Sequence, residues 1–436
     1  MPSMRALDAF FLQLEDRHVA LHIGAVAVFE GPPPSADELR QRYVRIVADS
    51  PHSRQALRHV PFEMGRPRWV DAGELDLDYH VRRTALPAPG GPAQLERLVG
   101  RLMSHPLDPD RPLWEAWAVE GLEEGRWALL TKVHHSVVDG LGGMALFAEL
   151  LDASPARRPL AVRTEPNLVR RLLDTTWVTG RGAGAVLEAV AGTVRLVGSL
   201  RPTAPSSLTG ALGTPRRYRT LSVALDDVRT VRETFGGTIN DVVLAMVTRG
   251  FHELLLARGE PTPTGAVRCL VPVSTRSAAE AHAGANRISL LLVDLPVDSA
   301  EPAATYRLLR TRLDTLKASG EAKAGGRGFA AVDLLPAPLV AAAMNLARRV
   351  PQRVVTTVAT NVPGPRAAQT LLGRRMLTLY PYVPIAEGIR IAVAVTSYRD
   401  QLHFGVTCDW AAVPDVDVFV AALADGLADL VKDATG

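Results

Sequence analysis

The chain of 436 residues is longer than one hydrophobic core usually organises, so we expect two domains. Apolar residues make up 47% of the sequence and charged residues 22%, which excludes an intrinsically disordered chain. The net charge of +3 is too small to indicate strong nucleic-acid binding.

Cysteine usage and hydropathy indicate the class of protein. Cys269 and Cys408 lie far apart and lack the spacing of metal ligands, so we interpret them as buried thiols rather than a disulfide framework. The N-terminus, MPSMRALDAFFLQLEDRH, has no basic segment followed by an apolar run, and no stretch reaches the roughly 18 apolar residues of a membrane span. We therefore expect a cytoplasmic protein that is soluble or peripheral on the inner face of the membrane.

The first third of the chain alternates predicted strands and helices. Residues 22–31, HIGAVAVFEG, indicate a buried strand, and Ser35 is placed to cap the helix that follows. Residues 113–135, LWEAWAVEGLEEGRWALLTKVHH, predict a hairpin in which two apolar runs flank a GLEEG turn. Residues 143–153, GMALFAELLDA, predict a helix.

A basic segment follows. Residues 157–219 carry eleven Lys or Arg against three acidic residues, an excess of eight positive charges that leaves the rest of the chain net acidic. The segment contains RPTAPSSLTGALGTP, a composition typical of a linker. Two interpretations stay open: a solvated connection between domains, or a basic element that touches an anionic membrane surface.

The second half again mixes strands with helices. Strands are predicted from RCLVPVST, RISLLLVDLPV, VVTTVATNV and the hairpin IRIAVAVTSYRDQLHFGVTCDW, and helices from PAATYRLLRTRLDTLKAS and PDVDVFVAALADGLADLVKDA. Residues 329–354 fit an interfacial membrane helix and a broken core helix equally well. We predict a mixed α/β fold with two domains of similar size, over residues 1–155 and 219–436, joined by a linker over residues 156–218.

The stretch VHHSVVDGLGG, residues 133–143, concentrates groups that carry chemistry. Neighbouring strand residues point to opposite faces, so His134 and His135 cannot easily converge on one ion, and we predict no metal site. Two interpretations remain: a general base, because the imidazole pKa lies near neutral pH, or a core histidine before an Asp-Gly turn. The combination of two histidines, Asp139 and the glycines favours catalysis.

At this point the chain resembles a known family. HHSVVDG resembles the HHxxxDG motif of the CoA-dependent acyltransferase superfamily. Further stretches are similar to the bacterial wax ester synthase/diacylglycerol acyltransferase family and occur in its order: LDAFFLQLED, PLW, TIND, VPVSTR and NVPGP. The resemblance covers nearly the whole chain and implies a condensation-domain-like fold with the active site between the two domains.

The resemblance also implies an activity, which is transfer of a fatty acyl group from acyl-CoA to the hydroxyl of diacylglycerol, a long-chain alcohol, or both. His135 would be the general base, with no acyl-enzyme and no cofactor beyond acyl-CoA as substrate. Asn240 would stabilise the oxyanion, His134 would support the loop, and Asp139 would anchor it. The further residues predicted to bind substrate or support the site are Gly140, Arg276, Trp114, Asp241, Asn361 and Pro363.

Several points stay open at the level of sequence. We hypothesise that Arg276 pairs with Asp139. Thr238 and Asp241 have the spacing of a capping box, and NVPGP is typical of a rigid turn. Val383 and Arg390 stand where family members often carry serine and asparagine, which leaves the preferred acceptor open. The alternative functions are a carrier-protein-dependent ester or amide synthase of a secondary pathway and a non-catalytic lipid-binding protein. Because these substrates are apolar, we also expect the protein to associate with a membrane or lipid droplet.

Overall fold

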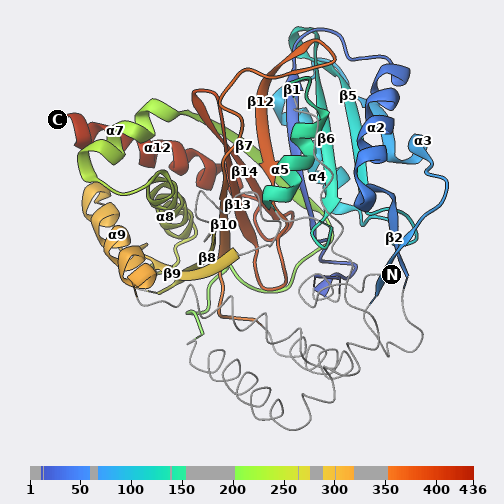
Figure 1. Ribbon diagram of the computed structural model, residues 1–436. Helices are drawn as coiled ribbons and strands as arrows, with labels where there is room; N and C mark the ends of the chain where they lie inside the picture. Colours follow the sequence, from blue (N-terminus) through green and yellow to red (C-terminus); the bar gives the residue numbers. More distant parts are fainter. Residues whose placement is uncertain are drawn as a thin grey trace.

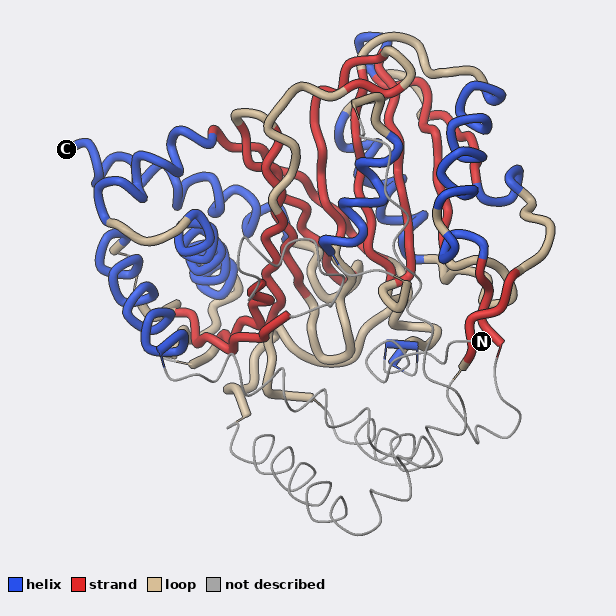
Figure 2. The backbone as a smooth tube through the Cα atoms, in the orientation of Figure 1, coloured by secondary structure: helices blue, strands red, loops and turns tan. Residues whose placement is uncertain are grey.

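The chain folds around two six-stranded sheets that lie side by side, with helices packed against them (Figures 1 and 2). This arrangement confirms the predicted mixed α/β fold. The computed structural model describes residues 11–12, 14–58, 67–137, 140–153, 202–263, 265–274, 288–299, 301–318 and 352–436.

The first sheet has the strand order β11-β12-β1-β6-β5-β4. Its strands are β1 (His22–Phe29), β4 (Val81–Ala85), β5 (Trp114–Leu122), β6 (Arg126–His134), β11 (Thr370–Leu371) and β12 (Arg374–Tyr382). The predicted hairpin is confirmed, since β5 and β6 pair antiparallel with Trp114 opposite Val133. On its other side β6 pairs with β1, which brings His22 opposite His134.

Helices cover both faces of this sheet because its strands are apolar on both sides. α2 (Ala36–Asp49) and α5 (Gly140–Leu150) pack on one face through side chains such as Leu39 and Phe147. α4 (Pro92–Ser104) packs on the other face through its apolar side chains, among them Leu98 and Met103. The predicted Ser35 cap of α2 is confirmed, and its hydroxyl accepts from the Glu38 N–H. The remaining elements of this half are α3 (Leu77–His80), β2 (Gln55–Arg58), β3 (Arg68–Asp71) and the short 3₁₀ helices η1 (Pro51–Arg54) and η3 (Glu123–Gly125).

The second sheet has the order β7-β14-β13-β10-β8-β9. Its strands are β7 (Arg216–Ala224), β8 (Val267–Ser274), β9 (Ile288–Leu295), β10 (Thr357–Val362), β13 (Ile391–Tyr398) and β14 (Gln401–Asp409). Four helices gather beside it: α7 (Leu225–Phe235), α8 (Ile239–Ala257), α9 (Pro302–Ala318) and α12 (Val416–Thr435) (Figure 1). Both cysteines are confirmed as buried free thiols, and burial raises the pKa of Cys269 and of Cys408 to about 12.

The sheets do not follow the order of the sequence. β11 and β12 come from the second half of the chain, yet β12 pairs antiparallel with β1 in the first sheet. α4 in turn contacts β7 of the second sheet, where Glu96 Oε1 accepts from the Thr220 N–H at 2.8 Å. Each half of the chain therefore contributes an element that packs with the other half. The domain boundaries predicted from the sequence did not include this exchange.

The close approach of β12 and β14 depends on Gly405. A Cβ added there would lie 1.8 Å from the Pro381 carbonyl oxygen and 2.6 Å from the Tyr218 hydroxyl oxygen. We expect Gly405→Ala to lower the free energy of unfolding by about 1–3 kcal/mol, because the backbones must move apart. Denaturant unfolding measures this. Gly213→Ala is the matched control, since a Cβ there meets nothing closer than 3.5 Å. Equal stability of the two variants would contradict the tight crossing.

Two sequence expectations concern the membrane. The basic segment within residues 157–219 and the segment over residues 329–354 lie for the most part outside the described residues. Among the helices that the structure describes, none is long and apolar enough to cross a bilayer.

Candidate active site

The backbone at the end of β6 sets the direction of both motif histidines. The His134 N–H donates to the Leu113 carbonyl at 3.0 Å, and the His135 N–H donates to the Leu21 carbonyl at 2.9 Å. Successive amides thus point to opposite neighbouring strands, as they do in extended backbone. The two imidazoles therefore project from opposite faces of the sheet, as the sequence predicts.

His134 is the inward histidine, with only 1% of its surface exposed. Its Nδ1 accepts from the Ser136 N–H at 3.0 Å and faces the Ser136 hydroxyl at 2.7 Å. Because Nδ1 accepts a backbone N–H, the ring proton is on Nε2, and this group donates to Glu15 Oε2 at 3.1 Å. The tautomer and the orientation of His134 are thus fixed from both sides.

Glu15 also contacts a second buried histidine. Its Oε1 lies 3.2 Å from Nε2 of His22, whose side chain is fully buried. Burial by itself would raise the pKa of Glu15, but the hydrogen bond from His134 and the contact with His22 outweigh it and hold this pKa well below the usual range. Burial lowers the pKa of His22 to about 4, so the ring is neutral near pH 7. A single carboxylate therefore contacts two buried imidazoles beneath the motif.

A buried lysine lies on the same face of β6. Burial lowers the pKa of Lys132 to about 8, and its ammonium donates to the Leu102 carbonyl at 3.1 Å and to the His105 carbonyl. Sequence reasoning did not single out Glu15, His22 or Lys132. The available signals were a glutamate inside the quoted LDAFFLQLED stretch and two polar residues within otherwise apolar strands.

His135 lies on the other face and is only partly buried. Its ring stacks on Phe11 with 4.1 Å between centroids and 25° between planes. Asp139 and Arg276 lie outside the described residues, so their predicted pairing stays a prediction. Gly140 is described as the first residue of α5, which begins directly after the motif.

A cavity of about 60 Å³ lies on the face of the sheet to which His135 belongs. Thr131 and Val133 line it, and they alternate in register with His135 along β6. The rest of the lining comes from α2, η1, β5, α5 and the motif loop. It is mostly apolar, with Ser53 and Glu115 as its polar members, and includes Tyr43, Ile46, Val47, Trp114, Val137, Gly143, Leu146, Phe147 and Leu150. The cavity therefore suits an aliphatic group on the same face of the sheet as His135.

Trp114 of the PLW stretch forms one wall of this cavity. Its indole N–H donates to the Ser53 carbonyl at 2.9 Å, and its ring stacks on His80 and on Tyr43. His80 is itself fixed by a contact of 2.7 Å between Nδ1 and the Trp114 carbonyl. Leu113 packs instead in a separate apolar cluster with Leu57. These contacts hold the Trp114 ring in place as one wall of the cavity.

The remaining predicted residues lie in the second half. Thr238 caps α8 and accepts from the Asp241 N–H, while the Asp241 carboxylate accepts from the Thr238 N–H at 2.8 Å. These two hydrogen bonds confirm the capping box. Asp241 is buried, and Asn240 is partly buried in the same first turn. The structure does not bring Asp241 into the histidine cluster. Asn240 as oxyanion donor stays a prediction.

The NVPGP stretch is a turn after β10, with Asn361 still in the strand and Pro363 just beyond it. The Gly364 N–H donates to the Ser397 hydroxyl at 3.2 Å, and a Cβ on Gly364 would lie 2.0 Å from the Ser397 carbonyl oxygen. The glycine is therefore required for close approach to β13. This geometry fits a structural role for the stretch.

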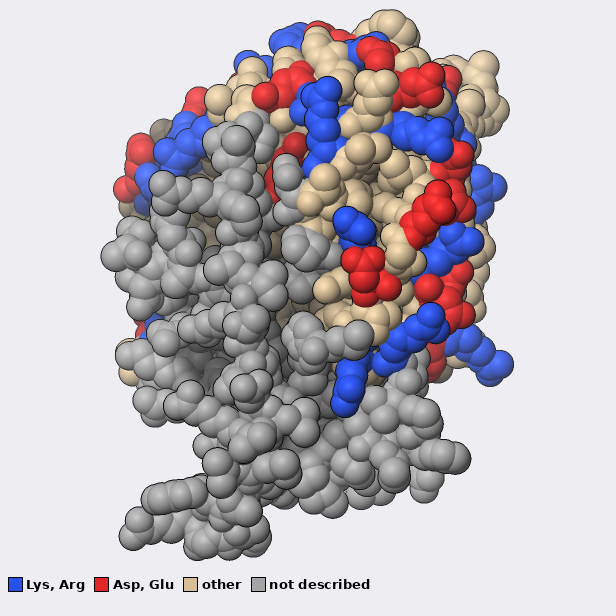
Figure 3. All heavy atoms as spheres, turned by 45° about the vertical axis from the view of Figure 1, so that its right-hand side comes forward, with Lys and Arg blue, Asp and Glu red and all other residues tan. Residues whose placement is uncertain are grey.

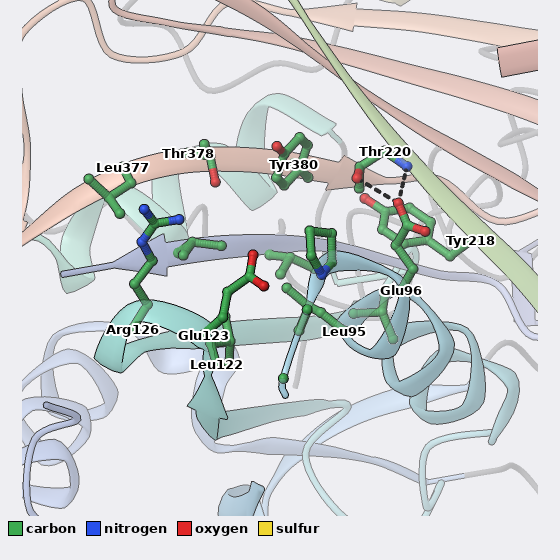
Figure 4. Close-up of a pocket in the computed structure, with 16 residues that line it drawn as sticks. Leu95, Glu96, Leu122, Glu123, Arg126, Tyr218, Thr220, Leu377, Thr378 and Tyr380 are labelled. Carbon is green, nitrogen blue, oxygen red and sulfur yellow. Dashed lines mark hydrogen bonds between the residues drawn. The ribbon is translucent and has the colours of Figure 1, made fainter. Parts of the chain in front are cut away.

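A larger cavity of about 130 Å³ lies elsewhere between α4, β1, β7 and β12 (Figure 4). Val26 and Val28 line it from β1, with Glu96, Thr220 and Tyr380 around it. Val26 is four residues along β1 from His22, a separation of about 13 Å. The cavity also lies on the α4 face, so it is separate from the region of His135. Among the described residues, no group of three or more His, Cys, Asp or Glu side chains could hold a metal ion.

Comparison with known proteins shows which family the sequence matches. The family model described as the wax ester synthase/diacylglycerol acyltransferase catalytic domain matches residues 4–243, and that of the WS/DGAT C-terminal domain matches residues 284–431. A protein of Mycobacterium tuberculosis named as a probable diacylglycerol O-acyltransferase is 41% identical, over 99% of this chain and 96% of its own length.

Solved structures give the same picture. The wax ester synthase/diacylglycerol acyltransferase from Marinobacter aquaeolei VT8 is similar with a TM-score of 0.74 and 26% identity, over the full length of both chains. The first condensation domain of the calcium-dependent antibiotic synthetase has a TM-score of 0.62 and 18% identity, over 99% of this chain and 97% of its own. This second likeness concerns the fold alone.

Proposed function

The chain belongs to the wax ester synthase/diacylglycerol acyltransferase family, and from this premise we propose how its histidine site carries out acyl transfer. The protein is an acyltransferase that uses acyl-CoA. The proposed acceptors are diacylglycerol, which gives triacylglycerol, and a long-chain alcohol, which gives a wax ester. The observation that carries the mechanism is the opposed pair of histidines at the end of β6. Glu15 holds one in place, and the other lies on the sheet face that carries a mostly apolar cavity.

In the proposed reaction, His135 takes the proton of the acceptor hydroxyl as its oxygen attacks the thioester carbonyl. The new C–O bond gives a tetrahedral oxyanion, for which the Asn240 amide is the proposed donor. Collapse breaks the C–S bond, and the imidazolium returns its proton to the CoA thiolate. The thioester is already activated, so the scheme includes no acyl-enzyme and no cofactor.

Two structural features support these assignments. His134 has both ring nitrogens engaged by Ser136 and Glu15, which leaves it no nitrogen for a substrate. His135 lies on the face of the cavity, whose apolar lining matches the aliphatic chains of both substrates. His134 is therefore assigned as the supporting residue and His135 as the base.

The experiment that tests this function measures thiol release from palmitoyl-CoA with diacylglycerol, with a long-chain alcohol, and with no acceptor. We expect release that depends on an acceptor. Release that is equal in all three mixtures would indicate hydrolysis. Release in none of them would favour the carrier-protein-dependent alternative, in which the acyl group arrives on a separate protein.

We also propose peripheral association with a membrane or lipid droplet, because both acceptors partition into lipid. On the face shown in Figure 3, described Lys and Arg side chains are interspersed with Asp and Glu. Because the described surface there shows mixed charge, we expect apolar contacts to dominate binding. The protein should therefore co-sediment with diacylglycerol-containing liposomes in both low and high salt. Recovery in the supernatant under both conditions would contradict membrane association.

A further inference from the structure

The hydroxyl of Tyr43 stands out among the buried tyrosines. Tyr218, Tyr306 and Tyr398 each donate to a backbone carbonyl, at 2.7, 2.6 and 3.0 Å. The Tyr43 side chain is 95% buried, and its hydroxyl has no hydrogen-bond partner among the residues that the structure describes. A buried hydroxyl without a partner weakens the folded state, so its presence points to a use outside folding.

Tyr43 is one of the residues around the cavity on the His135 face of the first sheet. Its ring stacks on Trp114 with 5.5 Å between centroids and 11° between planes. Trp114 pairs across the sheet with Val133, two residues before His135. The Cα atoms of Val133 and His135 are thus at most about 7 Å apart.

The chemistry of the substrates selects one partner for this hydroxyl. Burial raises the pKa of Tyr43 far above its ordinary value, so the group stays protonated and acts as a donor. A long-chain alcohol has a single oxygen, which reacts at His135. The fatty acyl chain has only the reacting carbonyl. Diacylglycerol, in contrast, carries ester carbonyls a few bonds away from its reacting hydroxyl.

The pantetheine arm of CoA also has carbonyls, but these belong to amides. Each amide N–H would require an acceptor of its own, and the polar side chains of the lining are already engaged. Glu115 accepts from the Trp117 indole N–H at 3.1 Å, and the Thr131 hydroxyl donates to the Ala25 carbonyl at 3.4 Å. An ester carbonyl brings an acceptor and no donor. It therefore matches a single buried hydroxyl in apolar surroundings.

We propose that Tyr43 is a specificity-determining residue whose hydroxyl donates a hydrogen bond to an ester carbonyl of diacylglycerol in the cavity on the His135 face of the first sheet. This inference rests on the proposed function and names the acceptor that the site distinguishes. It assigns the α2–α5 cavity to the glycerol ester rather than to CoA.

The test is Tyr43→Phe, which removes the hydroxyl and keeps the ring. We expect the ratio of kcat/KM for diacylglycerol to kcat/KM for hexadecanol to fall about 3- to 10-fold, the effect of one neutral hydrogen bond. The melting temperature should stay equal or rise, because no native hydrogen bond is lost. Tyr218→Phe is the matched control: it should lower the melting temperature and leave the ratio unchanged.

The outcomes separate the two levels of inference. An unchanged ratio in Tyr43→Phe overturns the proposal, as does an equal loss with both acceptors, which would indicate pantetheine. A wild-type protein that accepts hexadecanol and not diacylglycerol overturns it too, while the acyltransferase function stands. Absence of acceptor-dependent thiol release in the wild type would instead refute the proposed function itself.

Discussion

Replacing His135 by alanine should reduce acceptor-dependent thiol release from palmitoyl-CoA by about 10²- to 10⁴-fold, the contribution of a positioned general base. Without the imidazole, the acceptor hydroxyl must attack before its proton is removed. The fold should persist, because the His135 side chain lies on the partly exposed face of the β6 end and its backbone N–H still reaches Leu21. Thiol release with diacylglycerol and with hexadecanol measures the effect.

His105→Ala is the matched control, since this histidine is exposed and only its backbone carbonyl contacts the buried Lys132. We expect it to retain wild-type turnover. If His135→Ala kept turnover within about threefold of the wild type, His135 would not be the base. A non-catalytic lipid-binding protein would show no loss of function in either variant, so the same pair of variants also tests that alternative.

Replacing Glu15 by glutamine should lower kcat by about 10- to 100-fold and leave KM for acyl-CoA nearly unchanged. The carboxylate accepts from Nε2 of His134 at 3.1 Å and faces Nε2 of His22 at 3.2 Å. Glutamine removes the negative charge, so the Nε2–H group of His134 loses its charge-assisted acceptor, whereas His22 Nε2 already accepts the Leu107 N–H at 3.3 Å. Loss of a charge-assisted hydrogen bond costs about 1.5–3 kcal/mol. If His134 then no longer holds the loop that carries His135, this free energy corresponds to the expected decrease in rate.

Controls distinguish positioning from a purely structural role. Asp425→Asn neutralises an exposed carboxylate on α12 and should leave kcat unchanged. Glu15→Gln should unfold cooperatively and retain acyl-CoA binding. A variant that melts earlier yet keeps wild-type kcat would show that the Glu15–His22–His134 cluster serves stability alone.

Much of the local structure could be predicted from the sequence, because it depends on residues close together in the chain. Two apolar runs around GLEEG predicted the β5–β6 hairpin, and the spacing of Thr238 and Asp241 predicted the cap of α8. The period of a strand predicted that His134 and His135 face opposite sides, and their backbone hydrogen bonds confirm it. The motif order along the chain predicted the family, which the comparisons confirm.

Only the tertiary structure decided what surrounds those elements. Glu15 contacts His134 across 119 positions of sequence, and β12 enters the first sheet from the far half of the chain. Tyr43 reaches Trp114 from a separate helix, and no spacing rule connects the two. Caps and periodicity follow from bonds and torsions within a few residues, whereas the partners of a buried carboxylate or hydroxyl depend on which distant segments the fold brings together. The sequence by itself determined the elements, the histidine pair and the family. The fold determined which carboxylate locks one histidine and which cavity lies on the same sheet face as the other.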